Sequence, residues 1–286
     1  MELDERMSAE TRAYVQAYLG AIKNGEPGEM ARMPVQLTRD TRIHNARQVN
    51  AAHKLPGLTT CEMLVPSTEE SRRGGVPITV YVPKGARADA PVTVFFHGGG
   101  WTLCTRETHH YAVAHLADSS RTIWVSVEYR LAPEHSLDDM LADCRSALLW
   151  AAEHRESLSS AAARLGVAGD SAGGHLAARL AQEYRHQVDY QILIYPSVDL
   201  DFARYASASE FARPCHVLVP EVIAFFVENL VGRTPEQKLT PQASPILEED
   251  LAGLPRALVV LAQLDPLLDQ GLAYARKLTE HGNQCQ

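Results

Sequence analysis

The stretch Val167-Ala168-Gly169-Asp170-Ser171-Ala172-Gly173-Gly174-His175 holds a G-x-S-x-G pentapeptide at its centre. Small apolar residues precede the pentapeptide and good helix formers follow it (AGGHLAARLAQEY, 172–184), so it predicts a strand, a tight turn and a helix. This is the context of a nucleophile elbow, which presents a serine at a helix N-terminus. Gly169 and Gly173 lack the Cβ atoms that would collide with the neighbouring strand and helix. A chance match in a small-residue turn is the alternative, so the motif needs support from elsewhere in the chain.

The rest of the chain alternates short apolar runs with amphipathic segments. Predicted strands cover residues 61–65, 76–82, 92–96, 123–127, 190–195 and 257–262, and predicted helices cover 109–118, 136–154 and 269–281. The first two strands are expected to form an antiparallel pair. Strands that alternate with helices predict an α/β fold, with a mostly parallel sheet covered by helices on both faces.

Two regions fall outside this alternation and predict a helical cap. Residues 1–56 contain a helix from Ala9 to Ile22 that ends at Asn24-Gly25, followed by a mixed polar stretch that breaks at Pro56-Gly57. Residues 57–286 form the predicted core. Residues 197–250 interrupt that core with several prolines around one apolar helix, Val219 to Leu230, and are interpreted as an insertion that supplies the second part of the cap.

Composition excludes several classes of protein. The chain has 286 residues, 45% of them hydrophobic, and a formal net charge of −8, which argues against nucleic acid or an anionic membrane as its partner. Its five scattered cysteines favour a reduced, cytoplasmic protein with no metal site. The charged N-terminus gives no signal peptide, and no apolar run approaches the roughly twenty residues of a membrane span. The oligomeric state stays open.

A glycine-rich loop supports the elbow. His97-Gly98-Gly99-Gly100-Trp101 follows the predicted strand 92–96, and acyl transfer by a serine needs N–H donors for an oxyanion. The N–H groups of Gly98, Gly99 and Ala172 are the predicted oxyanion hole. Trp101 and His110 are predicted to line the substrate pocket, and Asp170 is expected to organise loops through hydrogen bonds.

Four blocks together resemble a known family. HGGGW at 97–101, YRLAPEH at 129–135, GDSAGG at 169–174 and LDPLLDQG at 264–271 are similar to the hormone-sensitive-lipase-like family of α/β hydrolases, which includes acetyl esterases and arylacetamide deacetylases. The resemblance implies the α/β-hydrolase fold and a serine carboxylesterase without metal or cofactor, acting on short-chain or aryl acyl esters beneath a helical cap. It also implies that Ser171 is the catalytic nucleophile and Asp265 the acid of the triad. Asp265 follows the strand 257–262, at the carboxyl edge where α/β sites are built, whereas the competing Asp199 opens the insertion.

The general base is the part that is not found. In this fold a histidine follows the acid, after one more strand, roughly thirty residues downstream. Only His281 follows Asp265, and as a helix-terminal histidine beside Gly282 it is better explained by capping. The apolar strand 257–262 would also be left as an open edge. These observations predict that the chain is C-terminally incomplete, with a strand, a helix and the histidine beyond Gln286, and that the 286-residue form is weak or inactive.

A second hypothesis belongs to another class of protein. A non-catalytic small-molecule-binding protein could reuse the hydrolase pocket, similar to the gibberellin receptor, which lacks the triad histidine. Such a role needs only the pocket and its lid. The natural substrate, its acyl length and the preference for ester or amide are not legible in the sequence.

Overall fold

The computed structural model describes residues 6–21, 27–55, 57–68, 74–160, 163–213, 218–232 and 235–286. A seven-stranded sheet of order β1-β2-β4-β3-β5-β6-β7 forms its centre. The strands are β1 (Leu58–Val65), β2 (Val76–Pro83), β3 (Val92–Phe96), β4 (Ile123–Val127), β5 (Leu165–Asp170), β6 (Tyr190–Ile194) and β7 (Arg256–Val260). The first two strands pair antiparallel, as predicted, and β3 to β7 are mutually parallel.

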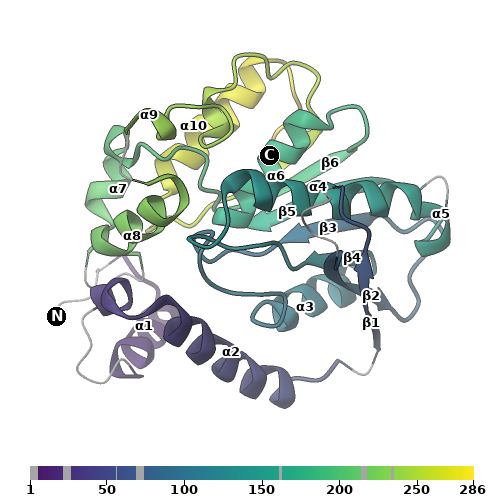
Figure 1. Cartoon of the computed structure of the whole chain (residues 1–286), viewed down its shortest axis with the longest axis horizontal. Coiled ribbons are helices and arrows are strands. Elements are labelled where there is room, and N and C mark those ends of the chain that lie inside the picture. Colours follow the sequence, from purple (N-terminus) through teal and green to yellow (C-terminus); the bar gives the residue numbers. More distant parts are fainter. Residues whose placement is uncertain are drawn as a thin grey trace.

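Helices cover both faces of the sheet (Figure 1). The helices α4 (Leu137–Glu153), α6 (Ala172–Glu183) and α10 (Leu268–Glu280) contribute to a core cluster on one face, and α3 (His110–Ser120) contributes to a second cluster on the other. The period of two in β2 explains this division: Ile78 and Val80 join the first cluster, whereas Tyr81 joins the second. The predicted α/β class and the two-sided covering are therefore confirmed.

The N-terminal region is more helical than its sequence pattern indicates. The helix α1 (Ala9–Ala21) begins where predicted, while its predicted end at Asn24-Gly25 and the break at Pro56 lie outside the described residues. After the short helix η1 (Pro27–Arg32), α2 (Val35–Ala52) occupies a stretch for which no regular element was predicted.

Polar contacts, rather than an apolar stripe, hold α2 against the rest of the protein. Thr38 is its buried residue, so the sequence shows no apolar period there. Arg39 instead donates to the carbonyl oxygens of Thr102 and Ala132, both at 2.8 Å, and pairs with Glu134. Helix α2 is thereby tied to the loops at the carboxyl edge of the sheet.

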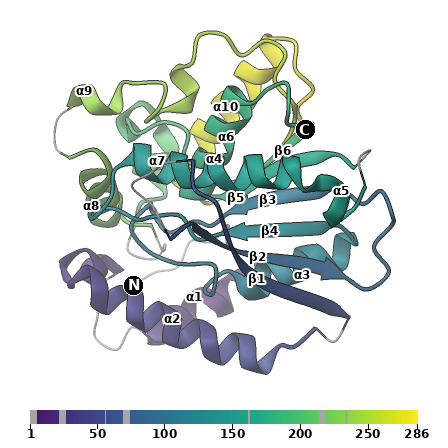
Figure 2. The same ribbon diagram turned by 45° about the vertical axis from the view of Figure 1, so that its right-hand side comes forward.

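The insertion at 197–250 holds a group of short elements around one longer helix. These are η2 (Phe202–Arg204), α7 (Ala206–Glu210), α8 (Pro220–Val231), α9 (Pro235–Lys238) and η3 (Pro245–Leu247), and the remaining short helix of the described chain is α5 (Arg155–Leu158). The predicted apolar helix is confirmed as α8. It contacts η1, where the Glu221 side chain lies over Gly28, so the N-terminal region and the insertion meet at one end of the sheet (Figure 2).

The outer strand β7 has one partner besides β6. The N–H groups of Ala257 and Val259 donate to the carbonyl oxygens of Gln284 and Gln286, both at 2.8 Å, so residues 284–286 run parallel to β7. Leu258 remains 42% exposed. A further strand and helix beyond Gln286 stay a prediction. No helix in the described ranges is both long and apolar enough to cross a membrane.

Candidate active site

Ser171 lies in the predicted turn between β5 and α6. Its φ of 53° and ψ of −117° are rarely adopted by a residue with a side chain, so the turn is strained. The end of β6 holds it on both sides: the Ser171 N–H donates to the Ile194 carbonyl at 2.9 Å, and the Ser197 N–H donates to the Ser171 carbonyl at 3.0 Å. The prediction of strand, turn and helix is confirmed.

The close contacts of the turn require Gly169 and Gly173. A Cβ on Gly173 would overlap the Phe96 carbonyl oxygen, and one on Gly169 would overlap the backbone of Gly173. Both obstacles are backbone atoms, which cannot rotate away as a side chain can. The predicted reason for these two glycines therefore agrees with the structure.

The glycine loop differs from its prediction at Gly98. The Gly98 N–H donates to Asp170 Oδ1 at 2.8 Å, so this donor is already used inside the protein and does not face a ligand. Burial opposes ionisation of Asp170, but His109 and the Gly98 N–H together hold the pKa of this carboxyl below its ordinary value. Asp170 thus organises the loop, as expected, and Gly98 is corrected from an oxyanion donor to a structural residue.

Three other N–H groups remain as candidate donors beside Ser171. Within the described part of the chain, the N–H groups of Gly99, Gly100 and Ala172 have no hydrogen-bond partner. Gly99 and Gly100 have φ values of 118° and 60°, which turn the backbone sharply after β3. Gly100 was not predicted, although it is the third glycine of the same run. A glycine run shows that the backbone bends but not which N–H faces the serine.

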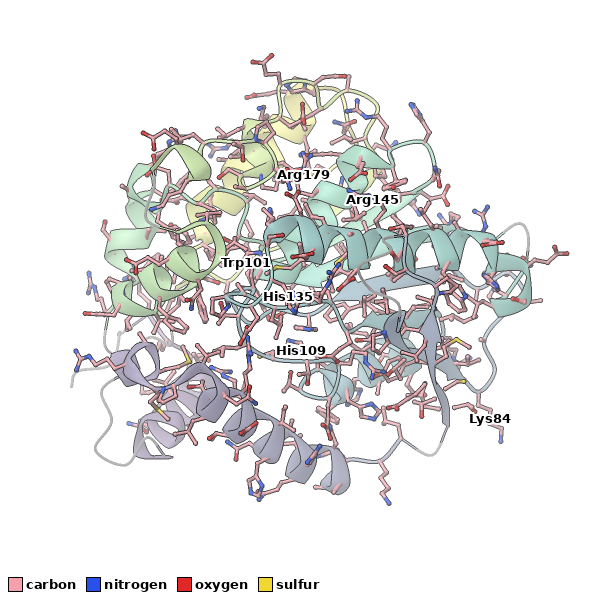
Figure 3. The ribbon with its side chains drawn as sticks, in the orientation of Figure 1. Lys84, Trp101, His109, His135, Arg145 and Arg179 are labelled. Atoms are coloured by element: carbon pink, nitrogen blue, oxygen red, sulfur yellow. The ribbon has the colours of Figure 1, made fainter. Side chains whose placement is uncertain are left out.

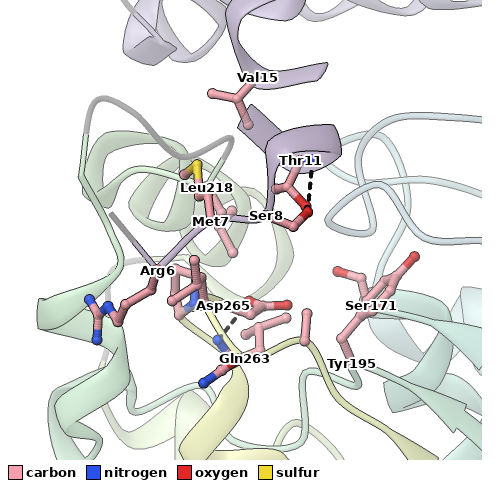
Figure 4. A pocket seen from close by; sticks show the side chains of 14 residues that line it. Arg6, Met7, Ser8, Thr11, Val15, Ser171, Tyr195, Leu218, Gln263 and Asp265 are labelled. Carbon is pink, nitrogen blue, oxygen red and sulfur yellow. Dashed lines mark hydrogen bonds between the residues drawn. The ribbon is translucent and has the colours of Figure 1, made fainter. Parts of the chain in front are cut away.

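Ser171 and Asp265 line one cavity of about 690 Å³ (Figure 4). Asp265 Oδ1 accepts a hydrogen bond from the Leu267 N–H at 2.8 Å, which fixes the carboxylate in the turn after β7. Tyr195 lies in the same cavity; burial, together with the negative charges of Asp170 and Asp265, raises the pKa of its phenol to about 12. The hydroxyl of Tyr195 therefore stays protonated at neutral pH.

The alternative acid, Asp199, is committed elsewhere. Its carboxylate is fully buried, accepts hydrogen bonds from the Tyr205 hydroxyl at 2.8 Å and the Asp201 N–H at 2.9 Å, and pairs with Arg204. Asp199 does not line the cavity that contains Ser171. The structure therefore brings Asp265, and not Asp199, to the serine.

One wall of this cavity was not foreseen from the sequence. The start of the described chain supplies it, through Arg6, Met7, Ser8, Thr11 and Val15 (Figure 4). These residues are more than 150 positions from Ser171, and no motif marks them. Only the packing of the N-terminal region against the insertion places them there.

No histidine of the described residues lines this cavity. His281 caps α10, whose 13 residues span about 20 Å from the end near Asp265. His97 is buried against Tyr129, with Nδ1 2.8 Å from the Gly98 carbonyl, and burial and nearby His109 lower its pKa to about 3. His97 is thus used within the glycine loop.

The two predicted pocket residues lie in different places. Trp101, labelled in Figure 3, lines a small cavity of about 30 Å³ together with Ser171 and side chains of α8. His110 lines a separate cavity of about 480 Å³, where its Nδ1 is 3.0 Å from the Tyr81 hydroxyl. Sequence reasoning placed His110 at the substrate because it follows the glycine loop, but α3 carries its side chain toward β2.

His175 joins the glycine loop to the insertion. The Trp101 indole N–H donates to His175 Nδ1 at 2.8 Å, and His175 Nε2 is 2.8 Å from the Gln242 carbonyl. Because a carbonyl can only accept, Nε2 carries the proton and the imidazole is neutral. Burial lowers the pKa of His175 to about 4.

This buried imidazole predicts a loss of stability in acid. The folded-state pKa of about 4 lies below the unfolded value near 6.5. The contribution of His175 to the free energy of unfolding is therefore fully present above pH 6.5 and is lost as the pH falls to about 4. The expected loss from His175 is about 3 kcal/mol over that window. Urea unfolding of wild type and His175→Gln at several pH values measures it. The glutamine variant should lose less stability across the window, and parallel pH profiles would contradict the assignment.

Comparisons with known proteins agree with this geometry. A model of the α/β-hydrolase fold family matches residues 93–286. The carboxylesterase NlhH of Mycobacterium tuberculosis is 35% identical over 213 residues, and an arylesterase of Saccharolobus solfataricus is 34% identical over 210; each match covers 72% of this chain and 66% and 68% of the relative, respectively. The solved Pyrobaculum calidifontis esterase superposes with a TM-score of 0.85 at 34% identity, over 98% of this chain and 87% of that one.

Proposed function

The chain belongs to the hormone-sensitive-lipase-like group of the α/β-hydrolase family, and on this premise we propose that it hydrolyses carboxylic esters through an acyl-enzyme on Ser171. The observation that carries the proposal is one cavity shared by a serine in a strained elbow and the carboxylate of Asp265. The names of the similar proteins, which include an esterase and an arylesterase, support it.

The proposed reaction has two stages. Ser171 Oγ attacks the ester carbonyl carbon and loses its proton, and the carbonyl oxygen takes the negative charge. The N–H groups of Gly99, Gly100 and Ala172 hold this oxyanion, with Gly100 in place of Gly98. The alcohol then leaves with a proton, and water hydrolyses the acyl-enzyme to release the acid and restore the hydroxyl.

The proton acceptor is proposed to be a histidine outside the described residues, oriented by Asp265. Serine is a weak nucleophile at its ordinary pKa, and none of the histidines in the described residues lines the cavity that holds Ser171 and Asp265. The hypothesis that this histidine follows Gln286 is tested by assaying the 286-residue chain beside one extended past that residue. Equal activity of the two proteins contradicts it.

We propose that the N-terminal region and the insertion together act as the cap. Met7, Thr11 and Val15 wall the larger cavity, while Phe226 and its neighbours on α8 wall the smaller one. An ester bound at Ser171 would be covered from both sides and shielded from water. Short-chain or aryl acyl esters are the proposed substrates, in keeping with two cavities of unequal size.

One observation favours a second candidate, a binding protein without turnover. Among the described residues that line the cavity of Ser171 and Asp265 there is no histidine. A protein of this kind would bind esters and never acylate Ser171, so trapping the covalent intermediate separates the two functions.

The test is acylation of Ser171 by 4-nitrophenyl acetate. The reaction is quenched in acid, and peptides are analysed by mass spectrometry. In the chain extended past Gln286, we expect an acetyl group on the peptide that contains Ser171, absent from the Ser171→Ala variant and retained in a Ser157→Ala variant, whose hydroxyl is exposed and bonds the His154 carbonyl. Acetylation that is equal in wild type and Ser171→Ala would disprove the proposed function.

A further inference from the structure

Ser171 stands between two cavities of very different size. The larger, about 690 Å³, contains Asp265. The smaller, about 30 Å³, is walled by Gly100, Trp101 and apolar side chains of the insertion, among them Phe202 and Phe226. An ester that is attacked by Ser171 has an acyl side and an alcohol side, which two cavities can hold separately.

The smaller cavity is closed tightly by α8. The Phe226 ring packs against Gly100 so closely that a Cβ on this glycine would overlap it. One water molecule needs about 10–15 Å³ of such volume, so the cavity has room for about two or three non-hydrogen atoms. It therefore fits the short carbon chain of a small acid and excludes longer chains.

Ser197 is one of the residues that line this apolar space. Ser197 is 3% exposed, and its Oγ is buried with no hydrogen-bond partner among the described residues. Its backbone N–H is bonded to the Ser171 carbonyl at 3.0 Å, which fixes Ser197 directly beside the serine of the elbow. A buried hydroxyl without a partner costs free energy, which a ligand that hydrogen-bonds to it regains.

We propose that the smaller cavity is an acyl subsite selective for 2-hydroxyacyl esters, in which Ser197 Oγ, turned into the cavity by rotation about χ1, hydrogen-bonds the hydroxyl on the carbon next to the ester carbonyl. This rests on the proposed function, because it takes Ser171 as the attacking group. A glycolyl group, HO–CH₂–CO–, has the same number of non-hydrogen atoms as a propionyl group, CH₃–CH₂–CO–, and carries a hydroxyl in place of the methyl group. A site built to hydrogen-bond a substrate hydroxyl discriminates against the analogue that lacks it.

The test measures binding without turnover. In the Ser171→Ala background, dissociation constants of methyl glycolate and methyl propionate are measured by ligand-observed NMR, with the fluorescence of Trp101 as a second readout because it lines the cavity. We expect methyl glycolate to bind at least about tenfold more tightly. Adding Ser197→Ala should bring the ratio near one, whereas adding Ser157→Ala should leave it unchanged. Because no hydrolysis is needed, failure of the esterase proposal does not affect this result.

Two outcomes overturn the inference. Equal constants for the two esters with Ser197 intact would mean that the hydroxyl is not used, as when it holds a water that neither ester displaces. A preference that survives Ser197→Ala would place the recognition elsewhere. Phe226→Ala gives an independent check: it should enlarge the cavity and tighten binding of methyl butyrate about tenfold, and unchanged binding of methyl butyrate would show that this cavity does not hold the acyl chain.

Discussion

Gly173→Ala is expected to yield no stably folded protein. The added Cβ would overlap the Phe96 carbonyl oxygen and lie 2.7 Å from the His97 carbonyl oxygen, both backbone atoms at the end of β3. Relief requires α6 to move away from the centre of the sheet. Backbone overlaps of this kind cost more than about 4 kcal/mol, a large part of the 5–15 kcal/mol that stabilises a typical domain. Far-UV circular dichroism and urea unfolding of the purified variant measure the effect.

Gly74→Ala is the matched control for this substitution. A Cβ at Gly74 meets no atom of the described residues within 4 Å, and no left-handed φ is found for this glycine. Its urea midpoint should equal that of wild type. A Gly173→Ala protein that unfolds at the wild-type midpoint would show that the elbow and β3 are not as closely packed as described.

Ser171→Ala is expected to reduce the rate of ester hydrolysis to that of the uncatalysed reaction in buffer. Removing the nucleophile of a serine hydrolase costs several powers of ten in kcat, so a loss of at least about 10³-fold in kcat/KM is expected wherever wild-type turnover is measurable. Alanine and serine share the same backbone strain at this position, so the variant should keep the wild-type unfolding midpoint. Initial rates with 4-nitrophenyl acetate give the comparison, and a variant as active as wild type would remove Ser171 from the mechanism.

Added imidazole gives this comparison a second arm. The cavity between Ser171 and Asp265 has about 690 Å³ and no histidine among its described lining, so a small nitrogen base has room to act there. Imidazole should increase hydrolysis by the 286-residue chain beyond its own rate in solution. The Ser171→Ala variant is the control. An equal increase in the rate of hydrolysis in both proteins would contradict the hypothesis that Ser171 lacks a general base.

The core strands and the elbow could be predicted because the residues that determine each of them are contiguous in the sequence. Strand β5, the turn and α6 follow from one contiguous stretch in which apolar period, glycines and helix formers agree. Helix α2 could not be predicted, since Arg39 and other polar contacts hold it and only Thr38 is buried. The partners of Arg39 lie 63 to 95 positions away in the sequence.

The site shows the same division between local and distant information. The sequence placed Ser171 and Asp265 correctly at the ends of their strands, and the structure brings them to one cavity. The sequence could not show that Gly100 rather than Gly98 is available as an oxyanion donor. This depends on the Asp170 side chain, which accepts the Gly98 N–H. The Ser197 hydroxyl, which is buried with no hydrogen-bond partner among the described residues, has no signature in the sequence, because its burial depends on tertiary packing.

The hydrogen bond between His175 and Gln242 restrains the part of the insertion that contains residue 242. Moving Gln242 away would leave the buried Nε2–H of His175 without an acceptor, which carries a free-energy penalty. On the N-terminal side, Arg6 and Glu210 form an ion pair that is nearly half exposed on each side and therefore weak, whereas Arg39 ties α2 to the loops after β3 and β4. The residues around Arg6 should therefore move away from the cavity more easily than either α2 or residue 242.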